Sequence, residues 1–262
     1  MTLLAAKEKK PKYATWIRQK KILTFWALSI SLFVAGTLAG LLYGPLALTA
    51  LLALPFFYIA SIISLAAFRF GIRGGDFQNK IHETLMASLG SNRSVLDIGC
   101  GSGNLVIKIA KRNTPNHIGL DFWGEDWEYS KSQCENNARL EQVKNVSFVQ
   151  GSASALPFDS GSIDNVVSCL TFHEVKDAAD KIKSLEEAMR VLAPGGRFAF
   201  FDLFNDASYF RRLEDVKNSI EAAHGKIDTI KPYSQIESLP FPLNMPKVLQ
   251  YAVLIAGEKS EI

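Results

Sequence analysis

The chain has 262 residues, of which 48% are hydrophobic and 21% are charged, enough for one full α/β domain with an appendage. Its net charge of +3 is uneven: residues 1–21 carry seven basic residues and one acid, residues 22–68 carry no charge, and residues 69–262 carry 22 basic and 25 acidic residues. The acidic excess after residue 68 argues against a basic nucleic-acid-binding face, and three widely spaced cysteines fit neither a disulfide framework nor a zinc site.

Residues 22–68 predict a hairpin of two membrane-spanning helices, over 22–43 and 45–68. A helix needs about 20 apolar residues to cross the hydrocarbon layer, and both segments exceed that length without a charge. The pair Gly44-Pro45 between them favours a tight turn. A signal peptide would have a shorter apolar region and no second span behind it, and a buried core hairpin seldom lacks charge over such a length, so both alternatives are less favoured.

Two features inside the hairpin concern its packing. Pro55 is expected to kink the second span, which membrane helices tolerate. Gly36 and Gly40 have the G-x-x-x-G spacing that allows close contact between helices, although small residues also occur in spans without such a role. The sequence leaves open whether these two glycines form a helix contact.

Basic residues on both flanks predict the orientation of the hairpin. Seven Lys and Arg residues precede the first span, Arg69 and Arg73 follow the second, and the turn has none. The positive-inside rule places both termini in the cytoplasm, as parts of an integral protein of the cell membrane. We therefore expect four parts: a basic cytoplasmic N-terminus (1–21), the hairpin (22–68), a linker (69–80) and a cytoplasmic domain (81–262).

From about residue 80 the chain alternates strand and helix patterns. Helices are predicted at 81–90, 104–112, 125–143 (with acids in its first turn that suit its dipole) and 177–192. Strands are predicted at 94–99, 116–122, 145–150, 162–170, 196–204 and within KVLQYAVLIAGEK, with a proline-rich loop over 232–246. Repeated βα units with apolar strands imply a doubly wound α/β domain, a mostly parallel sheet covered on both faces.

The stretch VLDIGCGSGN (95–104) follows the first strand of this domain and indicates a nucleotide-like ligand. Gly99 and Gly101 let the backbone approach a ligand. The G-x-G-x-G spacing differs from the G-x-G-x-x-G that seats a pyrophosphate, and Asp97 would repel a pyrophosphate but suits an ammonium group. Asp121, at the end of the second strand, is placed to accept hydrogen bonds from ribose hydroxyls. S-adenosylmethionine has both a ribose and a cationic amino-acid end.

Four motifs together resemble class I S-adenosylmethionine-dependent methyltransferases. The family's first motif is matched by VLDIGCGSG, its ribose-binding strand end by IGLDF, its G-D-A-x-x-L-P-F segment and next strand by GSASALPFDSGSIDNVVS, and its fifth-strand motif by VLAPGGRFAFFD. They lie within residues 80–205 and suit the quinone- and lipid-modifying branch, with a methyltransferase type 11-like domain. The resemblance implies a seven-stranded Rossmann-like sheet and S-adenosyl-L-methionine as the cofactor.

The resemblance also implies which positions surround the cofactor. The methionine moiety would be lined by Asp97, Gly99, Cys100, Gly101 and Gly103. The backbone of Cys169 would lie near it, and Asp121 would hold the ribose. Phe122 would pack on the adenine, while Ser152 and Ala153 would meet its edge. The family commonly has Asp at the position of Ser152, where a hydroxyl can donate or accept a hydrogen bond but brings no charge.

His173, in TFHEV after the fourth strand, is the best side chain to deprotonate or orient a methyl acceptor. The methyl donor is already activated, so the protein mainly positions the reactants, and a base is needed only when the acceptor loses a proton. The histidine is equally well explained as a loop residue that hydrogen-bonds the backbone. The aromatic stretch 122–130 offers a similar choice, between packing at a helix start and a wall of the ligand site.

These patterns predict a membrane-anchored methyltransferase that acts on a small, lipid-phase or interfacial acceptor, with no metal site and no nucleic-acid partner. One alternative is a membrane-tethered module that binds S-adenosylmethionine without turnover, which Ser152 and the absence of an unambiguous base permit. Another is a nicotinamide-dependent oxidoreductase, which the glycine spacing disfavours. The acceptor atom and the oligomeric state are left open.

Overall fold

The computed structural model describes residues 10–124, 127–246 and 248–261. It separates into two compact units. The sheet unit comprises Met1–Tyr13, Ile81–Ser238 and Leu249–Ile262, and the hairpin unit comprises Ala14–Lys80 and Leu239–Val248.

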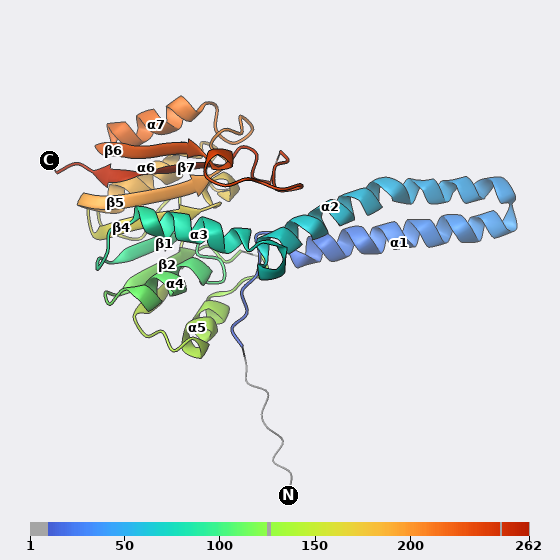
Figure 1. Cartoon of the computed structure of the whole chain (residues 1–262), viewed down its shortest axis with the longest axis horizontal. Helices are drawn as coiled ribbons and strands as arrows, with labels where there is room; N and C mark the ends of the chain where they lie inside the picture. The colour runs from blue at the N-terminus through green and yellow to red at the C-terminus, as the bar shows by residue number, and fades with distance from the viewer. Residues whose placement is uncertain (1–9, 125–126, 247, 262) are drawn as a thin grey trace, which may run out of the picture. The chain divides into compact units, whose positions relative to one another are not determined.

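The hairpin unit contains two long apolar segments that run side by side (Figure 1). The first is α1 (Gln19–Leu42), and the second is the 3₁₀ helix η1 (Gly44–Ala53) followed by α2 (Leu54–Phe70). Both segments are long and apolar enough to cross a membrane, and only 11% of the most apolar window of each is buried. That exposure is unlike the burial of a core helix in a soluble protein.

The second predicted span differs from the continuous kinked helix that the sequence predicts. Residues 44–53 wind as a 3₁₀ helix, and the α-helical hydrogen bonding begins only at Leu54. Pro55 therefore lies in the first turn of α2, where its missing N–H removes no helical hydrogen bond. The proline marks a change of helix type instead of a kink within one α-helix. A 3₁₀ turn, Ile72–Gly74 (η2), follows α2.

Small residues bring α1 and η1 together. A Cβ atom on Gly36 would lie 2.3 Å from the backbone nitrogen of Ala50, and one on Gly40 would lie 2.6 Å from Cβ of Ala47. Because a larger side chain has no room at either position, the structure decides for the helix-contact interpretation of this G-x-x-x-G pair.

The sheet unit is built on a seven-stranded sheet with the order β3-β2-β1-β4-β5-β7-β6. Its strands are β1 (Val95–Ile98), β2 (His117–Asp121), β3 (Val146–Gln150), β4 (Ile163–Cys169), β5 (Leu192–Asp202), β6 (Gly225–Pro232) and β7 (Val253–Lys259). Strands β3, β2, β1, β4 and β5 pair in parallel, and β7 is antiparallel to both of its neighbours. The helices are α3 (Phe77–Ser88), α4 (Asn104–Arg112), α5 (Lys131–Leu140), α6 (Ile182–Val191) and α7 (Leu213–Ala222), with short 3₁₀ turns η3 (Phe172–Glu174) and η4 (Tyr233–Gln235).

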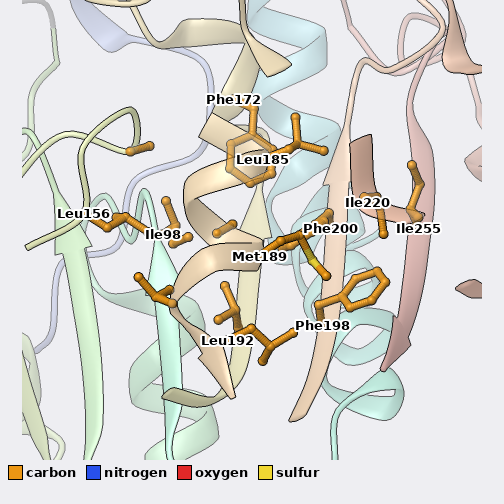
Figure 2. Close-up of a cluster of buried hydrophobic side chains, with 14 of the residues drawn as sticks. Ile98, Leu156, Phe172, Leu185, Met189, Leu192, Phe198, Phe200, Ile220 and Ile255 are labelled. Atoms are coloured by element: carbon orange, nitrogen blue, oxygen red, sulfur yellow. The ribbon is translucent and has the colours of Figure 1, made fainter. Parts of the chain in front are cut away.

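Helices cover both faces of this sheet. Asp97, Gly119 and Phe148 are in register across β1, β2 and β3, so they share a face, and Phe148 packs with side chains of α4 and α5. Leu120, the next residue of β2, points to the other face and joins the larger core with α6 and α7. Figure 2 shows Met189 of α6 among the strand side chains of that core. The expected doubly wound, mostly parallel sheet is confirmed.

Four predicted starts of elements are wrong. The helix predicted over 81–90 begins at Phe77, within the predicted linker, and the helix predicted over 177–192 begins only at Ile182. The helix predicted over 125–143 begins at Lys131 as α5, because the extended Ser130 caps it by accepting a hydrogen bond from the Gln133 N–H at 3.2 Å; residues 125–126 lie outside the described part. The strand predicted from residue 196 begins at Leu192, because the Pro-Gly-Gly turn is absorbed within β5, next to a register shift against β4.

The sequence patterns assign no element to residues 205–231, where the structure has α7 and most of β6. The apolar residues Val216 and Ile220 of α7 are buried at helical spacing and offered a signal. Strand β6 lies at the sheet edge, and its charged Lys226 and Asp228 are exposed, so its apolar pattern is weak.

Candidate active site

The predicted site residues lie together at one edge of the sheet, at the carboxyl ends of four adjacent parallel strands. The glycine loop, residues 99–103, follows β1; Asp121 ends β2; Ser152 and Ala153 follow β3; Cys169 ends β4; and His173 lies in η3 just beyond it. The strand order reverses between β1 and β4, and ligands of open α/β sheets bind at such a point.

The glycine loop curls over the end of β2. Gly99, Gly101 and Gly103 have φ angles of +78°, +55° and +80°, which favour glycine. The N–H groups of Gly99 and Cys100 both donate to the carbonyl of Leu120, at 2.7 and 3.0 Å. These bonds fix the loop against the neighbouring strand.

Gly99→Ala is expected to destabilise the sheet unit by about 2–4 kcal/mol, because it combines a left-handed φ with overpacking. The added Cβ would lie 2.0 Å from Oγ1 of Thr171. Chemical denaturation measures the loss. Thr171→Gly removes the clash, so Gly99→Ala should cost less stability in the Thr171→Gly background than in the wild type. An equal cost in both backgrounds would contradict the steric explanation.

Asp97 is buried on the face of the sheet that is covered by α4, the helix that follows the glycine loop. Burial first, and then the nearby carboxylate of Asp121, raise its pKa to about 8. Among the residues that the structure describes, none hydrogen-bonds its Oδ2 atom. An unpartnered buried carboxylate oxygen beside a ligand-binding loop is suited to receive a cationic group.

Asp121 is held in place by the backbone. Its Oδ2 atom accepts the Gly101 N–H at 2.9 Å and its Oδ1 atom accepts the Trp123 N–H at 2.8 Å. Burial raises its pKa, and these hydrogen bonds oppose the rise. These bonds leave acceptor capacity on the carboxylate, so the side chain can still accept a hydrogen bond from a hydroxyl. Phe122, the next residue, is 65% exposed and leaves an aromatic face for a ligand.

The segment after β3 contains a hydrogen-bonded chain that the sequence patterns do not reveal. The hydroxyls of Ser152 and Ser154 lie 2.9 Å apart, and that of Ser154 donates to Oδ2 of Asp177 at 2.9 Å. Asp177, from the loop before α6, thus brings a carboxylate close to the position where the methyltransferase pattern has Asp. Ala153 between the serines is buried.

The cysteines of the site are buried thiols. Burial raises the pKa of both Cys100 and Cys169, so they stay protonated and unreactive near neutral pH. Cys134 of α5 donates its S–H to the carbonyl of Gly101 at 3.1 Å and so supports the glycine loop.

The ring of His173 pairs with a carboxylate, and no backbone group of the described residues hydrogen-bonds it. Its Nδ1 atom lies 2.5 Å from Oδ1 of Asp202, which is fully buried at the end of β5 and whose other oxygen accepts the Phe172 N–H at 2.7 Å. Burial lowers the pKa of His173, but Asp202 and Glu174 together raise it above its ordinary value. The ring of Tyr209 lies 5.0 Å from the imidazole. A carboxylate on one ring nitrogen is the arrangement that orients a histidine base.

Asp202 and Tyr209 contact His173 at the candidate site, and the sequence patterns assign a role to neither. Asp202 had a signal, because it ends the fifth-strand motif and therefore lies on the same sheet edge as His173. Tyr209 follows in a segment without a readable pattern, so only the folded chain brings its ring to His173.

Comparisons with known proteins agree with this geometry. A family model described as a methyltransferase domain matches residues 89–239. The chain is 37% identical over 106 residues to the demethylmenaquinone methyltransferase of Lactococcus lactis, covering 40% of this chain and 39% of the relative. It is 32% identical over 123 residues to the ubiquinone/menaquinone biosynthesis C-methyltransferase UbiE of Rickettsia felis, covering 46% and 48%. The chain thus spans less than half the length of these curated relatives.

Solved structures share the fold. The geranyl diphosphate C-methyltransferase of Streptomyces coelicolor, in complex with Mg²⁺, geranyl diphosphate and S-adenosyl-L-homocysteine, superposes with a TM-score of 0.57 at 16% identity, over 71% of this chain and 81% of that one. The [4+2]-cyclase SpnF gives a TM-score of 0.55 at 15% identity, over 70% and 81%. Since a cyclase shares this fold, the fold alone does not specify an activity.

Proposed function

Because this chain belongs to the methyltransferase domain family, we propose that it transfers a methyl group from S-adenosylmethionine to a small acceptor at the carboxyl edge of its sheet. The observation that carries the proposal is the buried Asp97 carboxyl group, whose Oδ2 atom is unpartnered among the described residues, beside a glycine loop that is itself tied to Asp121. A cationic amino-acid group and a ribose match these two carboxylates, whereas a pyrophosphate does not.

The cofactor's groups are assigned to residues as follows. Asp97 would hold the ammonium group, and the methionine moiety would be lined by Gly99, Cys100, Gly101, Gly103 and Cys169. Asp121 would accept hydrogen bonds from the ribose hydroxyls. Phe122 would pack on the adenine, and Ser152 and Ala153 would meet its edge. When bound, the cofactor supplies an activated methyl group on a sulfonium, so the protein's task is chiefly to position the acceptor.

His173 acts as the general base toward the acceptor. Asp202 receives the Nδ1–H, which fixes the imidazole in the tautomer whose Nε2 atom is free of a proton. Nε2 then accepts a proton from a hydroxyl or an acidic carbon of the acceptor, and the resulting imidazolium is stabilised by the buried Asp202 carboxylate. Asp202 is a positioning residue in this scheme.

The hairpin anchors the chain in a membrane, with both termini and the sheet unit on the cytoplasmic side. The apolar surfaces of α1, η1 and α2 and their basic flanks support this assignment. Two relatives carry quinones in their names, which supports a lipid-phase acceptor for this chain. Anchoring the enzyme next to a membrane-dissolved acceptor raises their effective concentration for one another.

The full-length protein in mild detergent, given methyl-labelled S-adenosylmethionine and separate lipid and cytosol extracts, is expected to place label in the organic phase. Mass spectrometry of that phase then identifies the acceptor. Label confined to the aqueous phase would contradict the lipid-phase acceptor. Cofactor binding without any transfer in either extract would overturn methyl transfer in favour of a binding module.

A further inference from the structure

The four residues before the hairpin unit form a strap, residues 10–13, against α5 of the sheet unit. The backbone N–H of Lys12 donates to Oδ1 of Asn137 at 2.8 Å. The Lys12 carbonyl accepts from Nδ2 of Asn137 at 2.9 Å and from Nε2 of Gln133 at 2.8 Å. The side-chain amide of Asn137 therefore pairs with both backbone groups of Lys12, as a neighbouring strand would.

The same Asn137 reaches the glycine loop. Its Nδ2 atom also donates to the carbonyl of Ser102, between Gly101 and Gly103, at 3.0 Å. The side chain is fully buried, and its two amide hydrogens are divided between the strap and the loop. One residue thus joins a segment 125 positions away in the sequence to the loop that receives the cofactor.

A second set of contacts also connects the strap to the glycine loop. Tyr13 of the strap packs against the apolar cluster that contains Cys100 of the loop and Cys134 of α5, and its hydroxyl lies 3.4 Å from Oε1 of Glu141. Cys134 in turn donates to the carbonyl of Gly101. Residues 133, 134, 137 and 141 lie at helical spacing, so one face of α5 holds the strap and the loop together.

We propose that the strap keeps the glycine loop in its cofactor-binding conformation, with Asn137 as the positioning residue that connects them. The inference rests on the proposed function, because it needs a cofactor at the loop. Its consequence is reciprocal: if strap attachment favours the bound loop, cofactor binding must favour strap attachment by the same factor. The segment that leads into the apolar hairpin is then part of the cofactor site.

The test uses the full-length protein in detergent with S-adenosylhomocysteine as the probe. Its Kd is measured by calorimetry, and detachment of the strap is measured as trypsin cleavage of the Lys12–Tyr13 bond. Asn137→Asp keeps the shape but removes both donors, and it is expected to raise Kd about tenfold and to speed cleavage. Gln133 hydrogen-bonds the strap but not the loop. Gln133→Ala should therefore raise Kd and speed cleavage to a smaller degree, about threefold. The matched control Asn136→Asp, on the neighbouring partly exposed position, should leave both unchanged.

The wild-type protein should be cleaved more slowly at Lys12–Tyr13 when S-adenosylhomocysteine is bound. Variants that are cleaved faster yet keep the wild-type Kd would overturn the coupling while leaving the proposed function intact. A wild-type protein that does not bind S-adenosylhomocysteine would overturn the proposed function, and the strap's role with it. If Asn137→Asp does not fold, Gln133→Ala decides the question, since its side chain is only partly buried.

Discussion

Asp97→Asn is expected to weaken S-adenosylmethionine binding about a hundredfold or more, while making the ligand-free protein more stable at neutral pH. The loss of affinity follows because the ammonium group would lose a buried charged partner. The gain in stability follows because Asp97 is fully enclosed and its Oδ2 atom lacks a hydrogen bond from the described residues. A carboxyl group in that setting destabilises the ligand-free protein. Asp97 therefore favours ligand binding at the expense of stability.

The stability gain of Asp97→Asn over the wild type should increase with pH. The pKa of Asp97 rises from 3.8 to about 8 on folding. Above pH 4 the unfolded carboxyl loses its proton while the folded one keeps it, so rising pH favours unfolding until about pH 8, by about 1.4 kcal/mol per pH unit at most. The amide of the Asp97→Asn variant has no such proton, so the variant and the wild type should differ little near pH 4.5 and diverge toward pH 7.5.

Thermal melts at these two pH values, without ligand, measure the divergence, and calorimetry measures the affinity. Asp159→Asn is the matched control, because it removes an exposed carboxylate and should change neither quantity. If Asp97→Asn retained wild-type affinity, the assignment of Asp97 to the ammonium group would be wrong. If its melting temperature stayed below that of the wild type at pH 7.5, the interactions of the carboxyl group, which include a hydrogen bond from the Val106 backbone, would outweigh its burial.

Asp202→Asn is expected to lower kcat about a thousandfold, as for loss of a general base, and to move the rising limb of the pH–rate profile to lower pH. The carboxylate raises the pKa of His173, against the lowering effect of burial. The base must be neutral, so the wild-type rate rises with pH through that raised pKa. Without the carboxylate the pKa of His173 falls, and the imidazole also loses the partner that fixes its tautomer.

Initial rates with labelled S-adenosylmethionine across pH 5–9 provide the profile, with the acceptor identified by the partition assay. His173→Gln should cost about as much as Asp202→Asn, and the double variant little more, because the pair acts as a unit. Glu174→Gln is the control: its carboxylate lies 3.7 Å from Nε2 of His173 and is partly exposed, so its removal should change kcat by less than about tenfold. An unshifted profile in Asp202→Asn, with S-adenosylhomocysteine binding intact, would reduce Asp202 to a structural role.

The sequence by itself determined the features that depend on neighbouring residues. Charge-free length defines the two apolar segments, and apolar runs with glycine turns locate five of the six expected strands within a few residues of where they lie. The glycine loop with Asp97, and Asp121 at the next strand end, follow from the same local patterns. Such patterns are readable because hydropathy period and glycine spacing act over a few residues.

Tertiary structure alone decided which polar groups meet. His173 hydrogen-bonds Asp202, 29 residues away in the sequence, because β4 and β5 are neighbours and their carboxyl ends lie side by side. Asn137 hydrogen-bonds Lys12 and Ser102. Ser130 caps α5, so this helix begins later than the acidic residues before it predicted. Strand β6 gains its place by pairing with β7 at the sheet edge. Each of these choices depends on strand order and on buried hydrogen-bond partners brought together from distant segments, which no local period encodes.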